Sequence, residues 1–458
     1  MLKYYNSAPV WVQNIACTLY GLKERKKRHG KQFYEHLSCL TNSDFNSRDN
    51  IVKYQKVKLS NLINYAYNNT DYYKSIFDSI NFNVSTNLDL NSFKNIPVLT
   101  KDIILNNKSK LLSNGIGNKS AFKVKTSGTT GSALSFPTTI NALSFQWAIW
   151  WRHRQRFGIK PNTWHVNVTG RPVVPLNQKK PPFWRWDYAR KQLLINMQSI
   201  RKENINSIIN VIDDARFEFY AGPPSMLFAL ASFIKDSGRS IKYKPKVIFT
   251  SAENLLEYQE SLLQEVFDCT VTEQYGFTEG CGNASKCRHG YYHEDWEFGV
   301  LECENKTFNP DGSYSGNILA TGFSNLAFPF IRYRIGDVGT WMPDNFVCPC
   351  GRESKVLKHI DGRIEDFVIT PEGNKIMRFG YLFQDSDGVK EAQVIQYELG
   401  SILIRIVPRA SYSKRDERII KKKVYSWISP TLNVEIQKVN HIPRTRSGKL
   451  RAVISYLQ

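Results

Sequence analysis

Residues 126–131 read Thr-Ser-Gly-Thr-Thr-Gly, and this short loop decides how the rest of the chain is interpreted. It follows the strand-like stretch Phe122–Lys125 and precedes a second such stretch at Ser135–Phe136. Gly128 and Gly131 permit backbone conformations in which successive N–H groups converge on an anion, and the hydroxyls add further donors. No Gly-Lys-Ser/Thr follows at the spacing of a Walker loop. The loop therefore predicts a phosphate site of another kind, although a disordered surface loop can have the same composition.

A second loop reads Pro-Arg-Thr-Arg-Ser-Gly-Lys-Leu-Arg over residues 443–451 and presents Lys449 on a tight turn. A single lysine is ordinarily no more than an exposed side chain. A carboxylate and ATP repel each other, however, and a cation that stabilises the charge developing at phosphorus would let them react. The two loops together therefore indicate activation of a carboxylate by ATP.

The composition is that of a folded protein with two or three domains. The chain has 458 residues, of which 41% are hydrophobic and 22% charged. Its formal net charge of +21 favours an anionic partner, such as a nucleotide, an acidic sugar or a negatively charged membrane. No run approaches the roughly 18 to 20 apolar residues of a transmembrane helix, and a cleaved signal peptide is not expected. Eight cysteines in so long a chain do not suggest a secreted disulfide framework, so we expect a cytoplasmic protein.

The chain divides into regions with different patterns. Residues 1–120 are expected to be helical and basic, with a charge run at Gly21–Lys31. This run is typical either of a solvated helix face or of contact with a membrane surface, and both interpretations stay open. Residues 121–300 alternate strand-like and helical patterns, for example a strand at Val247–Thr250, a helix at Asn254–Phe267 and a strand at Thr270–Tyr275. Such alternation predicts an α/β sheet, and the last hundred residues predict a small α+β domain of strand, helix, two strands, helix and strand.

The segment Trp147–Phe157 mixes aromatic and basic residues on a predicted helix. Aromatic rings stack on sugar or base faces, and arginines bind carboxylates or phosphates. The same pattern also fits aromatic core residues with a basic solvent-facing side. In the first case the segment would border a pocket for a large anionic substrate, and in the second it would be structural.

Three more segments accompany the two loops. Residues 274–280 read Gln-Tyr-Gly-Phe-Thr-Glu-Gly, residues 331–337 end a strand-like stretch on Asp337, and residues 361–366 read Asp-Gly-Arg-Ile-Glu-Asp. In order, spacing and content these motifs resemble the AMP-forming adenylating (acyl-CoA ligase) superfamily. Within it the chain resembles the phenylacetate–CoA ligase-like branch, and in particular members from capsular polysaccharide biosynthesis. The resemblance covers roughly residues 90–458.

The resemblance implies an ATP site built from these segments. The loop Thr126–Gly131 would hold the pyrophosphate side of ATP, Ser251–Glu253 would line the adenine, and Lys449 would reach the α-phosphate and the attacking carboxylate. We assign Lys449, Glu279 and Thr126 as catalytic residues. The residues assigned to binding are Thr126, Ser127, Gly128, Thr129, Thr130, Gly131, Ser251, Ala252, Glu253, Gln274, Tyr275, Gly276, Thr278, Glu279, Asp337, Arg363 and Lys449.

Four of these residues have more specific implied roles. Tyr275 would stack near the adenine, and Glu279 would hold Mg²⁺ between phosphate oxygens. Asp337 would accept hydrogen bonds from both ribose hydroxyls, which a carboxylate can do without a proton of its own. Arg363 would lie close to the ribose.

The resemblance also implies the domain organisation and fold class. We expect an α/β protein with a large adenylating domain of several subdomains at residues 1–362 and a small, mobile α+β cap at residues 363–458. In the family the cap rotates after adenylation about an acidic residue that follows Gly-Arg-x. Here that position offers Glu365 and Asp366, and the hinge could be either one.

Cysteine and histidine residues predict a structural zinc site. Cys348 and Cys350 form a tight pair of thiols, and a Cys/His-rich stretch lies at residues 281–293. Zinc in structural sites takes four such ligands in tetrahedral geometry, and some members of the branch bind zinc with such a set. We choose Cys287, His293, Cys348 and Cys350, with Cys281 and His289 as alternates. Free thiols on β-rich turns are the other interpretation.

The predicted reaction converts a carboxylic acid and ATP into an acyl-adenylate and pyrophosphate, followed by acyl transfer to a thiol, amine or hydroxyl. Coenzyme A is the generic acceptor by resemblance, and a capsular role suggests coupling of an acid to a saccharide. We expect ATP and Mg²⁺, no nucleic acid, and a monomer or homodimer. One alternative is adenylyl transfer to a hydroxyl with AMP retained on the product. Another is a non-catalytic binder of an anionic polymer.

Overall fold

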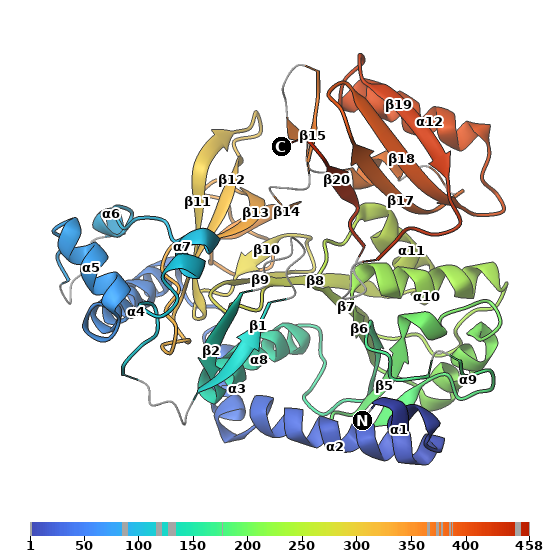
Figure 1. Cartoon of the computed structure of the whole chain (residues 1–458), viewed down its shortest axis with the longest axis horizontal. Helices are drawn as coiled ribbons and strands as arrows, with labels where there is room; N and C mark the ends of the chain where they lie inside the picture. The colour runs from blue at the N-terminus through green and yellow to red at the C-terminus, as the bar shows by residue number, and fades with distance from the viewer. Residues whose placement is uncertain are drawn as a thin grey trace. The chain divides into compact units, whose positions relative to one another are not determined.

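The computed structural model describes residues 2–84, 90–115, 121–126, 134–175, 177–363, 367–371, 375–376, 379–383, 386, 388–444 and 450–457 (Figure 1). The chain forms two compact units. The first consists of residues 1–18, 163–271 and 361–458, and the second of residues 19–162 and 272–360. Each unit has its own hydrophobic core.

A mainly parallel sheet forms the centre of the first unit. Its strands are, in sheet order, β7 (Val247–Ser251), β6 (Phe219–Gly222), β3 (His165–Thr169), β5 (Gln192–Asn196) and the antiparallel β4 (Arg185–Asp187). Every residue of β5 is buried, as expected of a strand that is covered on both faces. The helices and turns of this part are α1 (Leu2–Ser7), η1 (Met197–Ser199), α9 (Ile205–Ala215), α10 (Pro224–Asp236) and α11 (Glu257–Phe267). The alternation of strands and helices predicted from the sequence is confirmed here.

The boundaries of α11 differ from the prediction. The sequence predicts a helix from residue 254, whereas α11 begins at Glu257. The backbone N–H of Leu256 donates to the side chain of Gln259 at 3.1 Å, which caps the helix at this point. The preceding residues are therefore left to form the turn that follows β7.

The C-terminal part of the first unit is a small α+β fold. A four-stranded sheet has the order β19 (Asn433–Lys438), β18 (Ser401–Pro408), β17 (Val389–Gln396) and β20 (Val453–Ser455), and the helix α12 (Lys414–Trp427) accompanies it (Figure 1). A hairpin of β15 (Val368–Ile369) and β16 (Lys375–Ile376) precedes it. Where the sequence predicts the first of two helices, the described residues form only a 3₁₀ turn, η2 (Gly380–Phe383).

An antiparallel sheet dominates the second unit. Its strands are, in sheet order, β11 (Gly299–Phe308), β12 (Tyr314–Gly322), β13 (Tyr333–Trp341), β14 (Val356–Arg363), β10 (Tyr292–Glu294), β9 (Asn283–Lys286) and β8 (Thr270–Gly276). A separate hairpin pairs β1 (Ala121–Lys125) with β2 (Ser135–Thr139). The two strands that the sequence predicts on either side of the Ser/Thr/Gly loop are therefore confirmed.

Helices make up most of the chain before β1, as predicted. They are α2 (Val10–Arg28), α3 (Lys31–Asn42), α4 (Arg48–Asn69), α5 (Asp71–Ser79), α6 (Leu90–Phe93) and α7 (Lys101–Asn106), and α8 (Ile140–Gln155) follows the β1–β2 hairpin. Side-chain caps define several of these helices; Thr139 Oγ1, for example, accepts from the backbone N–H of Ala142 at 3.1 Å at the start of α8. Among the described residues, no helix has both the length and the apolar character needed to span a bilayer.

Candidate active site and metal centre

The segment predicted to line the adenine follows strand β7 directly. Ser251 is the last residue of β7, and Ala252 adopts a left-handed backbone conformation with φ of +72°. Such a conformation is costly for alanine, and strained residues of this kind gather at functional sites. The strained turn directs the chain from the buried strand into Glu253.

Glu253 joins this segment to the C-terminal part of the same unit. One carboxylate oxygen accepts from the backbone N–H of Ser225 in α10 at 3.1 Å, and the other accepts from the backbone N–H of Leu450 at 3.2 Å. Burial raises the pKa of the Glu253 carboxyl, against the lowering effect of these hydrogen bonds. Leu450 directly follows the predicted catalytic Lys449, which lies outside the described residues, as do Glu365 and Asp366. The hydrogen bond thus brings the neighbour of Lys449 to the predicted adenine segment.

In the second unit, Tyr275 and Asp337 form a hydrogen-bonded pair. The Tyr275 hydroxyl donates to Asp337 Oδ2 at 2.7 Å, and the Asp337 side chain is almost fully buried. The sequence places Asp337 at the end of a strand, whereas it lies within β13. The pairing of β12 with β13 shifts register between residues 317 and 319, opposite this part of β13, and the strand continues past the irregularity. Asp337 keeps further acceptor positions because a carboxylate offers about four lone pairs.

The other predicted site residues of the second unit lie next to Tyr275 in the sequence. Glu279 is half-buried on the turn after β8, where the Tyr333 hydroxyl donates to its Oε1 at 3.4 Å. Gln274 donates to the Ser285 hydroxyl at 3.3 Å, and Thr278 is exposed. A Cβ atom at Gly276 would lie 2.5 Å from Asn283 Oδ1, so a larger residue would displace that side chain.

Thr126 closes the base of the Ser/Thr/Gly loop. Its backbone N–H donates to the Leu134 carbonyl at 2.9 Å, and its hydroxyl accepts from the Leu134 N–H at 3.0 Å. The two ends of the loop are therefore tied together across the hairpin. Ser127, Gly128, Thr129, Thr130 and Gly131 themselves lie outside the described residues, and so does the side chain of Arg363, the last residue of β14.

The four residues predicted to bind zinc lie together in the second unit. Their candidate ligand atoms are all within 4.8 Å of one another. Cys287 follows β9, His293 belongs to β10, and Cys348 and Cys350 lie between β13 and β14. Cys350 Sγ lies 3.2 Å from His293 Nε2, and the Sγ atoms of Cys287 and Cys348 are 3.8 Å apart.

This donor set suits zinc, because three thiols and one imidazole can complete a tetrahedral structural site. Hydrogen bonds from Cys287 and His293 lower the pKa of the Cys350 thiol, so its sulfur carries thiolate charge more readily than an ordinary cysteine. The alternates do not join the cluster: Cys281 is buried in the hydrophobic core, and His289 is exposed. That the cluster binds a metal stays a prediction.

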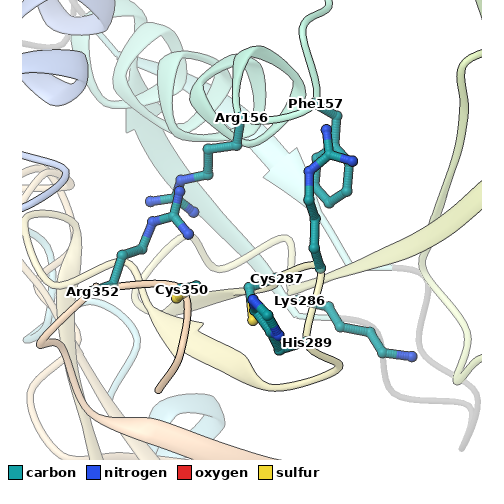
Figure 2. A pocket seen from close by; sticks show the side chains of 8 residues that line it. Arg156, Phe157, Lys286, Cys287, His289, Cys350 and Arg352 are labelled. Carbon is teal, nitrogen blue, oxygen red and sulfur yellow. The ribbon is translucent and has the colours of Figure 1, made fainter. Parts of the chain in front are cut away.

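A network of buried ion pairs supports the Cys348–Cys350 loop. Arg352 donates to Asp44 Oδ2 at 2.9 Å, and Asp44 also pairs with Arg156, which lies just after α8. Figure 2 shows Arg156 and Arg352 extending toward each other beside Cys350. Salt bridges with these cations lower the pKa of Asp44, although burial opposes them.

Arg152 continues the network further into the protein. Its guanidinium bonds Asp295 at 2.7 Å and Glu297 at 2.5 Å, and its side chain is only 2% exposed. Two arginines of the Trp147–Phe157 segment thus form ion pairs with buried carboxylates, which supports the structural interpretation of that segment. The sequence pattern does not predict the acidic partners of these arginines, although the Glu-Asp-Trp-Glu run that follows His293 is a local signal for two of them.

A pocket of about 200 Å³ lies beside the cysteine cluster (Figure 2). It is lined by Arg156, Phe157, Lys286, Cys287, Arg288, His289, Cys350 and Arg352. The guanidinium of Arg288 lies 4.8 Å from the centre of the Phe157 ring, a cation–π contact. The cluster is therefore reached from a basic surface.

Comparisons with known proteins agree with this architecture. Residues 368–456 match the family described as the CapK C-terminal domain. The chain is 27% identical to Protein CapK of Staphylococcus aureus over an alignment of 472 positions, which covers all of both chains. The predicted resemblance to capsular members is confirmed, whereas the phenylacetate–CoA ligase-like branch stays a prediction.

Solved structures show the same fold. The 2-hydroxyisobutyryl-CoA ligase in the postadenylation state, in complex with R3-HIB-AMP, matches with a TM-score of 0.71 at 16% identity, over 90% of this chain and 91% of that one. The same ligase with 2-HIB-AMP and CoA in its thioesterification state matches with a TM-score of 0.56 at 18% identity, again over 90% and 91%. The protein therefore has the fold of this CoA ligase.

Proposed function

We propose that the protein is an AMP-forming ligase that activates a carboxylic acid with ATP and then transfers the acyl group to an acceptor. The observation that carries this proposal is the hydrogen bond from the Leu450 N–H to Glu253. It brings the residue next to Lys449 to the segment expected to line the adenine, and both belong to one compact unit. The backbone next to Lys449 would then be held beside the nucleotide.

In the proposed first step, a carboxylate oxygen of the substrate attacks the α-phosphorus of ATP, and pyrophosphate leaves. Lys449 stabilises the negative charge that develops on the phosphorus oxygens. The ribose hydroxyls donate to Asp337, which Tyr275 holds in place. The Thr126–Gly131 loop receives the pyrophosphate. The half-buried carboxylate of Glu279 would hold Mg²⁺, which supplies charge neutralisation to the phosphates.

In the proposed second step, the acyl group leaves AMP for a thiol, amine or hydroxyl. The solved neighbours are complexes with R3-HIB-AMP or with 2-HIB-AMP and CoA, which supports CoA as one acceptor. Similarity to CapK along the whole chain supports a role in capsule biosynthesis. For this role we propose a cytoplasmic location and a saccharide acid or saccharide acceptor. We further propose that residues 363–458 move as a cap between the steps, about Glu365 or Asp366.

Exchange of labelled pyrophosphate into ATP tests the first step. We expect exchange that depends on an acid from a panel of uronic acids, amino acids and aryl acids. Lys449→Ala should lower the exchange rate by roughly 10² to 10³, the cost of removing a preorganised group that stabilises transition-state charge. Lys422→Ala, at an exposed position of α12, is the matched control and should exchange at the normal rate.

Two results would contradict the proposal. One is the absence of exchange with every acid of the panel, and the other is an equal rate for Lys449→Ala and Lys422→Ala. Mass spectrometry of the product adds a further check. Retention of AMP on the final product would show that the reaction is adenylyl transfer and not acyl transfer.

A further inference from the structure

Helix α2, labelled in Figure 1, is one of the longest helices before β1 and carries an apolar stripe that is exposed to the solvent. The stripe consists of Trp11, Ile15, Leu19 and Leu22, whose side chains are 65%, 50%, 61% and 50% exposed. Their spacing of four, four and three residues places them on one face of the helix. The face of a helix that is turned to water is normally polar. Here the exposed face is apolar, which indicates that a binding partner covers it.

The opposite face of α2, which packs against the protein, carries polar and small residues. The apolar residues are therefore not exposed merely because the whole helix is apolar. The buried positions are Gln13, Cys17 and Gly21, which also recur every four residues. Gln13 accepts from Arg185 Nε at 2.7 Å, and its own amide donates to the Ala8 carbonyl at 2.8 Å. Polar and small residues therefore hold the helix to the protein, while its large apolar residues face outward.

A basic region continues directly from the end of the stripe. Residues 21–31 contain six lysines and arginines against one acidic residue, Glu24. Glu24 pairs with Arg28, and Arg28 also lies over the Trp147 ring, so these two side chains are engaged within the protein. Lys23 and Lys26 are exposed, and so is the Lys31 side chain. An exposed apolar stripe thus ends in exposed cations.

We propose that α2 binds the surface of an anionic membrane, lying in the headgroup layer with its stripe inserted and its lysines on lipid phosphates. An interfacial helix combines an apolar face that carries tryptophan and leucine with cations close to that face, and α2 has both. Tryptophan favours the membrane–water interface. Each lysine near an anionic surface raises binding by about fivefold. A second copy of the chain would carry the same charge of +21, so charge complementarity favours lipid over self-association.

The membrane proposal does not depend on the proposed reaction, because neither the stripe nor these lysines belong to the nucleotide or metal sites. A ligase held at a membrane would act on substrates whose acid or acceptor is presented there. The two proposals therefore fail independently. Loss of membrane binding would leave pyrophosphate exchange unchanged.

Vesicle flotation of the full chain tests the proposal. We compare vesicles of phosphatidylcholine alone with vesicles that contain phosphatidylcholine and phosphatidylglycerol in a ratio of about 7 to 3. We expect at least tenfold tighter binding to the anionic vesicles, weakened by salt because the lysine contribution is screened. Equal binding to both vesicle types, or to neither, would overturn the proposal.

Paired variants separate the stripe from general surface properties. The double variant W11S/L19S should reduce binding at least tenfold, whereas F308S/V347S removes apolar residues that are 74% and 82% exposed elsewhere and should bind normally. K23Q/K26Q should lose binding to anionic vesicles, while K414Q/K422Q, with the same charge change on α12, should retain it. Normal circular dichroism and pyrophosphate exchange establish that each variant is folded.

Three outcomes would refute the membrane assignment. The stripe variants could bind as well as the wild type. The two control variants could lose as much binding as the stripe and lysine variants, which would indicate non-specific adsorption. Light scattering could show that the wild type is a dimer and that W11S/L19S is a monomer, which would identify the stripe as a contact between copies.

Discussion

Replacement of Arg152 by methionine should destabilise the second unit strongly, because it leaves two buried carboxylates without their main cation. Arg152 is 2% exposed and bonds Asp295 and Glu297 at 2.7 and 2.5 Å. Breaking a buried ion pair from one side costs about 3–5 kcal/mol. Asp295 retains bonds from Asn283 and Ser285, and Glu297 retains the Ser43 hydroxyl. We therefore expect the lower end of that range, about 3 kcal/mol.

Thermal unfolding measured by circular dichroism is the assay. A loss of about 3 kcal/mol should lower the unfolding midpoint by about 6–12 °C in a unit of this size. The control is Lys358→Met, which breaks an exposed ion pair with Asp311 and should leave the midpoint unchanged. If Arg152→Met melts within about 2 °C of the wild type, a shift well below that range, the network does not hold the unit as we argue.

Three further predictions concern the metal, the pH and the nucleotide. Metal analysis should find one zinc per chain, lost in Cys348→Ser and kept in Cys39→Ser, since Cys39 is exposed and outside the cluster; metal-free protein would contradict this. Burial lowers the pKa of His153 to about 3, so the unfolded state binds the extra proton first and stability falls as pH drops below about 6.5. Urea unfolding should show a loss of about 2 kcal/mol between pH 6.5 and 5, and His153→Gln should remove it; an equal loss in the variant would refute the assignment. Asp337→Asn should raise the KM for ATP in pyrophosphate exchange by about 10- to 100-fold, and an unchanged KM would exclude the ribose contact.

Local patterns in the sequence were sufficient for much of the fold. The buried run at Val247–Thr250 is apolar on both faces and therefore indicates a covered parallel strand. The cluster of Cys287, His293, Cys348 and Cys350 was also predictable, because few other residue types form a tetrahedral thiol–imidazole set. These features depend on periodicity or on rare chemistry, and both are visible in the sequence.

Features that depend on distant partners were not predictable. Asp44 bonds Arg156 and Arg352, which lie 112 and 308 residues further along the chain, and a lone aspartate in a loop gives no sign of either. The same holds for Trp150, whose indole N–H donates to Asn283 at 3.1 Å. The sequence of an aromatic and basic helix looks the same whether its side chains bind a substrate or the protein's own carboxylates. Only the fold shows which is present.

The Asp44 carboxylate has a consequence for how the cysteine cluster is assembled. Because Asp44 bridges Arg156 and Arg352, the loop that carries Cys348 and Cys350 is anchored by charge two residues beyond the second thiol. A loop anchored in this way is a preformed receptor, in contrast to small zinc domains that fold only when the ion arrives. Removal of the predicted zinc by a chelator should then leave the scaffold folded, and dialysis against zinc should reload the site without refolding.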